Sequence, residues 1–98
     1  MIKHIVTFKL SGNKEKRIEV ANKFKAALEA LPDIIEPLQS IEVGINENPA
    51  EDWDVVLTAI LPTMEDVEVY AKHPAHVAAA GLLAGHKESR ACVDYSVD

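Results

Sequence analysis

The sequence is poor in features that would tie it to an oxidising compartment or a membrane. Its single cysteine, Cys92, cannot form a disulfide within the chain. No apolar run approaches the roughly 18–20 residues that a membrane-spanning helix needs. The first residues already alternate as a strand does, with no charged and apolar leader before them. We therefore expect a cytoplasmic protein that does not engage a membrane.

Positive charge is also scarce, and glycine forms no motif. The chain has 10 Lys and Arg against 16 Asp and Glu, which gives a net charge of −6. Nucleic-acid binding needs a basic stripe to meet the phosphates, and none is present. Phosphate-cradling loops need closely spaced glycines, whereas the four here are scattered at Gly12, Gly44, Gly81 and Gly85. Nucleic acid is therefore not an expected partner.

What the sequence does contain is ordinary globular composition in one domain. Of the 98 residues, 48% are hydrophobic and 27% are charged. A disordered chain would carry fewer aliphatic residues and a larger charge imbalance. The length suits a single hydrophobic core, and no linker or internal repeat divides it. We predict one domain spanning residues 1–98.

The first part of the chain predicts a strand and then an amphipathic helix. Apolar and polar residues alternate from 2 to 10, which is typical of a strand. The positions expected on its covered face are Ile2, His4, Val6, Phe8 and Leu10. The period then becomes helical from residue 14 to residue 31, where Pro32 ends the helix. Its apolar stripe is predicted to be Ile18, Ala21, Phe24, Leu28 and Leu31.

The second part predicts three strands and an interrupted helix. Residues 41–45 and 53–61 are strands, and the latter is apolar on both faces, as a central strand covered on both sides would be. A helix follows until Pro74 interrupts it. Residues 75–84 continue as a helix with Pro74 in its first turn. Alternation over residues 90–97 predicts the last strand.

The resulting order, βαββαβ, predicts an α+β ferredoxin-like fold with a four-stranded antiparallel sheet. Helices in such a unit cover one sheet face only. The other face would carry Ile5, Val56 and Ile60, and an apolar face of this kind usually marks an interface. Two sheets packed face to face would cover it, so we predict a homodimer.

Three side chains able to exchange protons are expected around one pocket between sheet and helices. His4 lies on the covered face of the first strand, and Tyr70 lies on the inner stripe of its helix. The break at Pro74 can turn His76 back toward Tyr70. Histidine takes and returns protons near neutrality, and a tyrosine hydroxyl can donate to an oxygen that gains negative charge. This set suits proton abstraction beside a carbonyl, although a buried histidine and a stripe tyrosine also serve as plain core residues.

Metal binding and cysteine chemistry are not expected. His73 and His76 are three residues apart, but Pro74 lies between them, and no carboxylate or cysteine near them completes a ligand set. Cys92 lies within a predicted strand without a basic neighbour in sequence, as inert buried cysteines do.

Five segments together resemble the stress-responsive dimeric α/β-barrel family. They are Ile2–Leu10, Val43–Gly44, Trp53–Leu57, Tyr70–Val77 and Val93–Tyr95. The resemblance covers essentially the whole chain and is most specific in the Tyr-Ala-Lys-His-Pro-Ala-His segment. It implies a ferredoxin-like chain that dimerises into an α/β barrel, in a family whose functions differ more than its fold does.

The resemblance also implies roles for the candidate residues. The family includes a plant polyketide cyclase that forms olivetolic acid by an aldol condensation without a cofactor. Its catalytic tyrosine and histidine match Tyr70 and His76, and a pocket histidine of its first strand matches His4. A further pocket histidine of that cyclase is replaced here by Val55, which implies a more apolar pocket and a different substrate.

Three functions stay open at this point. The preferred one is a stress-responsive dimer that binds a small carbonyl or apolar ligand. The second is a cofactor-free cyclase or aldol-type lyase that uses Tyr70 and His76 as an acid–base pair. The third is a cofactor-independent oxygenase. The residues of the pocket that are predicted to contact a ligand are Val6, Phe8, Phe24, Leu28, Val55 and His73.

Overall fold

A computed structural model describes all 98 residues. Its elements are β1 (Ile2–Leu10), α1 (Lys14–Glu29), the 3₁₀ helix η1 (Leu31–Asp33), β2 (Ser40–Ile45), β3 (Val55–Leu61), α2 (Met64–Lys72), α3 (Pro74–Gly81) and β4 (Lys87–Ser96). The predicted βαββαβ order is confirmed, with α2 and α3 together forming the second helical region.

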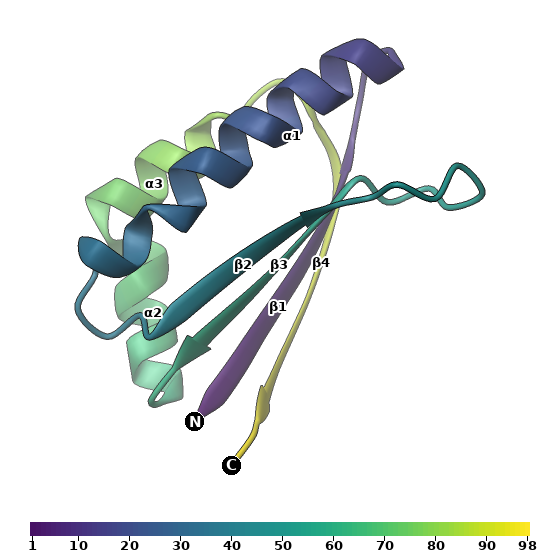
Figure 1. Ribbon diagram of the computed structural model, residues 1–98. Helices are drawn as coiled ribbons and strands as arrows, with labels where there is room; N and C mark the ends of the chain where they lie inside the picture. Colours follow the sequence, from purple (N-terminus) through teal and green to yellow (C-terminus); the bar gives the residue numbers. More distant parts are fainter.

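The four strands form one antiparallel sheet in the order β2-β3-β1-β4. All helices lie on one side of this sheet, and both chain termini lie at the same end of it (Figure 1). The register places His4 of β1 opposite Ala59 of β3 and opposite Asp94 of β4. Asp94 and the residues two positions away from it along β4 therefore lie on the helix-facing side of the sheet, as His4 does.

The hydrophobic core fills the space between the sheet and the helices. Phe8 of β1 meets Phe24 of α1 edge to face, with ring centroids 5.4 Å apart. Leu28 and Leu61 are fully buried in the same cluster. Edge-to-face aromatic contacts and aliphatic burial are the main favourable terms in such a core. They hold α1 against the sheet, where its main strand contacts are with β2.

The helical phase of α1 differs from the predicted stripe at its first turns. Ile18 was expected to be buried, but it is 44% exposed, and Val20 is buried instead. Ile18 borders an open cavity beneath the start of α1, so the sheet does not cover it. From Ala21 onward the predicted stripe is confirmed, because Ala21 and Phe24 are buried.

Three element boundaries also differ from the prediction. Helix α1 ends at Glu29, and Pro32 lies in η1. Strand β3 begins at Val55 instead of residue 53. Asp54 just before it still contacts β1, because its backbone N–H donates to the Phe8 carbonyl at 3.0 Å and its side chain accepts from the Leu10 backbone N–H at 2.7 Å. Strand β4 begins at Lys87, because its polar first residues still pair with the end of β1.

The sheet face opposite the helices is not covered within the chain. Strand β3 is interior, as predicted, but only its helix side is buried, and Val56 on the other side is 37% exposed. On the same face of β4, Val93 is 62% and Tyr95 is 42% exposed. The expectation that β3 is covered on both sides is therefore wrong for the single chain, since no helix reaches this face.

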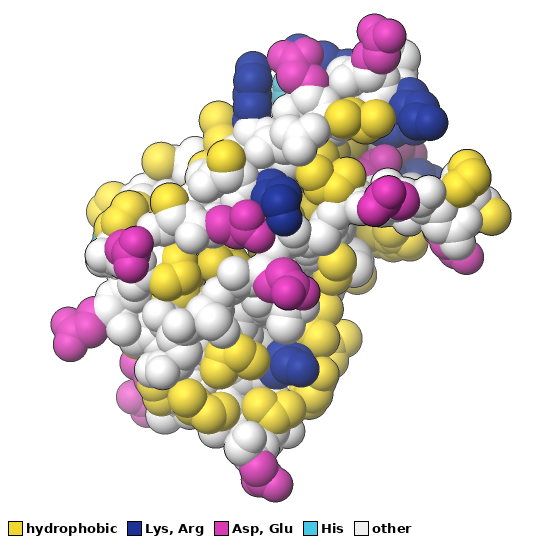
Figure 2. Space-filling model, in the orientation of Figure 1, with side chains coloured by type: hydrophobic (Ala, Val, Ile, Leu, Met, Phe, Trp, Pro, Cys, Tyr) yellow, Lys and Arg dark blue, Asp and Glu magenta, His cyan; other side chains and the backbone are white.

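The face of the molecule shown in Figure 2 is mixed in character. Acidic, basic and hydrophobic side chains alternate over it, and the projecting loop between β2 and β3 carries hydrophobic side chains at its tip (Figure 2).

None of the helices combines the length and the apolar character required to cross a membrane.

Candidate functional site

The break between α2 and α3 brings Tyr70 and His76 together. Helix α2 ends at Lys72, and His73 adopts an extended conformation before α3 begins at Pro74. The turn folds His76 back over the end of α2, so that its ring centroid lies 4.4 Å from that of Tyr70. Proline suits this place, because the first position of a helix needs no backbone N–H and a fixed φ favours the new helix.

His4 approaches Tyr70 from the sheet. Its ring meets the tyrosine ring edge-on, with centroids 5.8 Å apart and planes at 71°. His4, Tyr70 and His76 all line one cavity of about 130 Å³ between the sheet and the helices. That volume equals the liquid volume of about four water molecules. The three predicted acid–base residues are thus brought together around one cavity.

Of the residues predicted to contact a ligand, half line this cavity. Val6, Phe8 and Phe24 form part of its apolar wall. Leu28 and Val55 are instead buried in the core beyond the lining, with 0% and 2% exposure. His73, also outside the lining, caps α3.

The cap defines what His73 does in the fold. Its ring Nδ1 accepts a hydrogen bond from the backbone N–H of Ala75 at 3.0 Å. A side-chain acceptor at this position satisfies one of the free N–H groups at the start of a helix. His73 thereby stabilises the first turn of α3, directly after the break between α2 and α3.

The hydroxyl of Tyr70 is buried and has no hydrogen-bond partner in the protein. Tyr70 itself is fully buried. Burial raises the pKa of its hydroxyl well above the ordinary value of 10, because the charged phenolate would lose its hydration. Tyr70 therefore stays neutral and retains a proton to donate. An unpaired buried hydroxyl costs about 1–3 kcal/mol, which an acceptor entering the cavity would recover.

His76 is held in a defined tautomer. Its Nδ1 lies 3.0 Å from the backbone carbonyl of Ala71, and since a carbonyl only accepts, Nδ1 carries the proton and donates it. Nε2 then has a free lone pair. Burial lowers the pKa of His76, and the nearby His4 and Arg90 lower it further, against the opposing effect of the Ala71 carbonyl. Neutral His76 can thus accept a proton at Nε2.

His4 is joined to two residues of β4 that the sequence prediction missed as site residues. Its Nδ1 hydrogen-bonds the Asp94 carboxylate, and the Cys92 sulfur lies 3.7 Å from the same nitrogen. Cys92 also donates to the other Asp94 oxygen at 3.8 Å. Burial raises the pKa of the Cys92 thiol, and the charge of Asp94 adds to this. The signal was available in the alternation of β4, which placed Cys92 and Asp94 on one face, but the pairing register with His4 was needed to use it.

Two basic side chains border the cavity as well. Lys87 and Arg90 of β4 contribute to its lining, on the same strand face as Cys92 and Asp94. The cavity thus combines an apolar wall with a polar border that holds both signs of charge.

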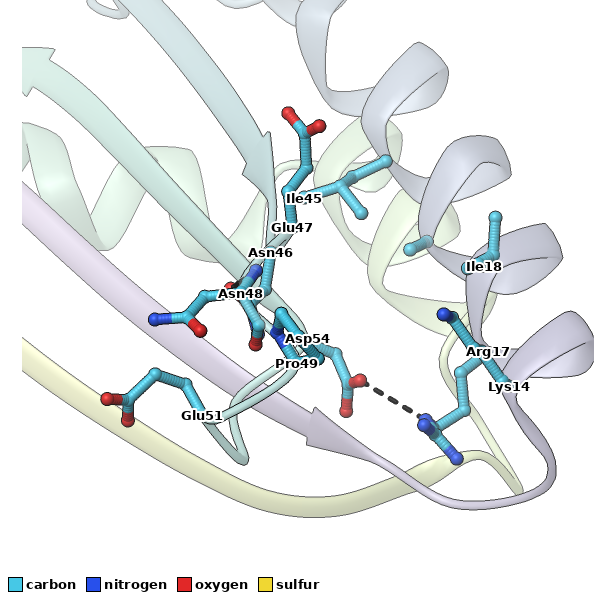
Figure 3. Close-up of a pocket in the computed structure, with 11 residues that line it drawn as sticks. Lys14, Arg17, Ile18, Ile45, Asn46, Glu47, Asn48, Pro49, Glu51 and Asp54 are labelled. Carbon is cyan, nitrogen blue, oxygen red and sulfur yellow. Dashed lines mark hydrogen bonds and ion pairs between the residues drawn. The ribbon is translucent and has the colours of Figure 1, made fainter.

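A second cavity, of about 480 Å³, lies under the start of α1 and contains none of the predicted site residues. It opens between α1 and the loop that joins β2 to β3 (Figure 3). Arg17 and Asp54 pair across it, with Nε and Oδ1 3.2 Å apart. Asp54 also accepts a hydrogen bond from the Leu10 backbone N–H. The ion pair with Arg17 therefore links α1 to the β2–β3 loop and, through Asp54, to the end of β1.

Solved structures share this fold. A dimeric protein of unknown function with a ferredoxin-like fold from Bacteroides fragilis is 50% identical, with a TM-score of 0.95 over 98% of this chain and 95% of that one. A dimeric ferredoxin-like protein of unknown function from Thermobifida fusca is 26% identical, with a TM-score of 0.80 over 98% and 90%. Hydroxynitrile lyase from Passiflora edulis is 16% identical, with a TM-score of 0.77 over 99% and 93%, a likeness of fold alone.

Comparison with curated proteins gives no match. The family model of the stress-responsive A/B barrel domain matches residues 2–97, which is almost the whole chain. The ferredoxin-like fold and the resemblance noted in the sequence agree with this match. The chain belongs to the stress-responsive A/B barrel domain family.

Proposed function

We propose that this protein is a homodimer in which each chain binds a small carbonyl compound in the cavity between the sheet and the helices. The observation that carries the proposal is the buried Tyr70 hydroxyl, which has no acceptor within the protein. A carbonyl oxygen in the cavity would supply that acceptor. Most buried polar atoms in folded proteins are paired, so an unpaired one in a cavity-lining residue is a reason to expect a ligand there.

The rest of the lining supports a small, partly apolar ligand. Val6, Phe8 and Phe24 offer an apolar wall. The rings of His4 and His76 contact the Tyr70 ring, so they restrict the positions that a polar group of the ligand can take near the Tyr70 hydroxyl. A ligand pocket commonly has this composition, an apolar surface with a few placed donors and acceptors. The volume of about 130 Å³ favours a ligand about the size of a five-membered cyclic ketone.

The dimer part of the proposal rests on the uncovered sheet face. Ile5, Val56, Ile60, Val93 and Tyr95 lie on this face and are all partly or largely accessible. An apolar face of this kind is costly in water. The relatives from Bacteroides fragilis and Thermobifida fusca are described as dimeric. Face-to-face pairing of two sheets would bury these residues.

Cyclopentanone is a suitable probe for binding, because it is small, apolar and carries one carbonyl oxygen. We expect it to shift the NMR signals of the Tyr70 ring and of Phe24 in a saturable manner. Tyr70→Phe should weaken this binding roughly 2- to 10-fold, the value of one lost hydrogen bond. Tyr95→Phe, on the opposite sheet face, is the matched control and should bind like the wild type. Equal binding by Tyr70→Phe and the wild type would remove the main support for the proposal.

A second candidate function is the cofactor-free lyase or cyclase. It is favoured by His76, whose Nε2 is free to accept a proton while Nδ1 is fixed on the Ala71 carbonyl. In the first step, Nε2 would take a proton from the carbon beside the carbonyl. The electron pair of that C–H bond would move to the carbonyl oxygen, and Tyr70 would stabilise the resulting enolate by a hydrogen bond. Carbon–carbon bond formation or cleavage would follow from the enolate.

Deuterium exchange into cyclopentanone tests this step without knowledge of the true substrate. Proton abstraction beside the carbonyl replaces hydrogen by deuterium in D₂O, and NMR follows the loss of the signal. We expect wild-type protein to speed the exchange and His76→Gln to lower that rate about 100-fold or more. His86→Gln is the matched control, because His86 lies outside the cavity lining. If the wild type gives no acceleration above buffer, binding is the function that remains.

A further inference from the structure

Three potential metal ligands of different chemistry meet where β1 pairs with β4. They are His4 Nδ1, the Cys92 sulfur and a carboxylate oxygen of Asp94, and these atoms all lie within 4.8 Å of one another. The antiparallel register causes this, because it sets Asp94 opposite His4 and Cys92 opposite Val6 on the same sheet face. This cluster differs from His73 and His76, which have no carboxylate or cysteine near them in sequence to complete a ligand set.

We propose that His4, Cys92 and Asp94 form a binding site for one zinc ion. A thiolate, an imidazole nitrogen and a carboxylate oxygen are the donors that zinc prefers. Zn–S bonds of about 2.3 Å and Zn–N or Zn–O bonds of about 2.1 Å place neighbouring donors of a tetrahedron about 3.6 Å apart. The sulfur lies 3.7 Å from His4 Nδ1 and 3.8 Å from Asp94 Oδ2. Two edges of the tetrahedron are therefore already close to their final lengths.

The remaining pair of ligands, His4 and Asp94, is joined by a hydrogen bond between His4 Nδ1 and Asp94 Oδ1, the carboxylate oxygen to which Cys92 does not donate. Zinc would replace this hydrogen bond by one bond to His4 Nδ1 and one bond to Asp94 Oδ2. The neutral imidazole would move its proton to Nε2 and bind through Nδ1. The Cys92 thiol would lose its proton to solvent as the Zn–S bond forms. One thiolate and one carboxylate then balance the charge of Zn²⁺, and one proton is released for each ion bound.

Three protein ligands leave the fourth position of a tetrahedron open. Sites of this kind hold water or a ligand oxygen there, whereas structural zinc sites use four protein ligands. His4 also lines the cavity, so the zinc site and the space assigned above to a carbonyl ligand share this residue. The zinc site is nevertheless independent of that assignment, because metal affinity is measured with no carbonyl compound present.

Accessibility and charge also bear on the site. The side chain of Asp94 is 23% exposed, so an ion from solvent can reach the cluster, while that of His4 is 10% exposed and held firmly in the sheet. Arg90 is the basic group near Cys92, and its positive charge favours the thiolate form of Cys92, the form that binds zinc.

Titration of the full-length protein with Co²⁺ and Zn²⁺ tests the site. Co²⁺ should produce a thiolate-to-cobalt absorption band, and Zn²⁺ should abolish it by displacement. Cys92→Ser should remove the band, and Asp94→Asn should weaken Zn²⁺ binding at least about 10-fold. His86→Gln is the control for non-specific binding by a histidine and should behave like the wild type.

Two results would overturn the zinc site. One is a wild-type protein that gives no thiolate band with Co²⁺. The other is Zn²⁺ binding that stays unchanged in both Cys92→Ser and Asp94→Asn, because the ion would then lie elsewhere. Both substitutions lie on the edge strand and conserve side-chain size, and circular dichroism of each variant confirms that it is folded before the titration.

Discussion

The rings of Tyr70 and His76 lie 4.4 Å apart between centroids, although Pro74 separates the helices that carry them. Pro74 makes this contact possible, because α2 ends just before it and α3 begins at it in a new direction. A continuous helix would place residues six apart on different faces. The interruption thus joins a buried proton donor to a neutral proton acceptor in one cavity.

Replacing Tyr70 by phenylalanine should separate stability from ligand binding. The hydroxyl has no partner in the folded protein, so its removal costs no hydrogen bond and relieves a desolvated polar atom. We expect the free energy of unfolding to stay equal or to rise by about 1 kcal/mol, while cyclopentanone binding weakens. Urea denaturation measures the first and NMR titration the second. A loss of stability of about 2 kcal/mol or more would mean that the hydroxyl has a structural partner.

His76 should make the protein less stable as the solution becomes acidic. Burial holds its pKa below the ordinary 6.5, so in mild acid the unfolded chain binds a proton that the folded chain does not. Its neutral form gives full stability above about pH 6.5, and this contribution is lost as the pH falls through the folded-state pKa. The urea midpoint should therefore fall less between about pH 8 and pH 5 in His76→Gln than in the wild type. Parallel curves for the two proteins would show that His76 is not shielded from water.

The sequence was sufficient to predict the order of elements and the three residues around the cavity. Periods of two and of 3.6 residues separate strands from helices, and Pro74 marks the break that turns His76 toward Tyr70. These signals are local. They depend on neighbours within a few positions and need no knowledge of which strands pair.

The contacts that were missed depend on pairing across the sheet. Asp94 reaches His4 over a sequence separation of 90 residues, and a one-residue slip in register would send its side chain to the opposite face. Ile18 was misplaced for a related reason, because helical phase does not reveal where the sheet beneath a helix ends. Leu28 and Phe24 share one stripe, yet only Phe24 borders the cavity.

That difference between Phe24 and Leu28 yields a matched pair of variants. Phe24→Leu and Leu28→Val each remove buried apolar volume, and each should cost roughly 1–2 kcal/mol of unfolding free energy. Only Phe24→Leu should enlarge the cavity and change the relative affinity for cyclopentanone and a bulkier ketone such as cyclohexanone. NMR titration with both ketones provides the comparison. Identical ketone preference in the two variants would place the ligand away from Phe24.

A charge on the uncovered sheet face should abolish the proposed dimer. Val93 is 62% exposed in the single chain, and its Cα partner in β1 is Ile5, at the middle of that face. In a face-to-face dimer, Val93→Glu would bury an unpaired carboxylate near its counterpart, at a cost of about 3 kcal/mol or more. Dimer affinity should then fall by about 100-fold or more, and light scattering should report the mass of one chain. Val69→Glu is the control, since Val69 is 52% exposed on α2, and the mass should stay that of two chains. A Val93→Glu protein with the mass of two chains would show that the dimer forms through another surface.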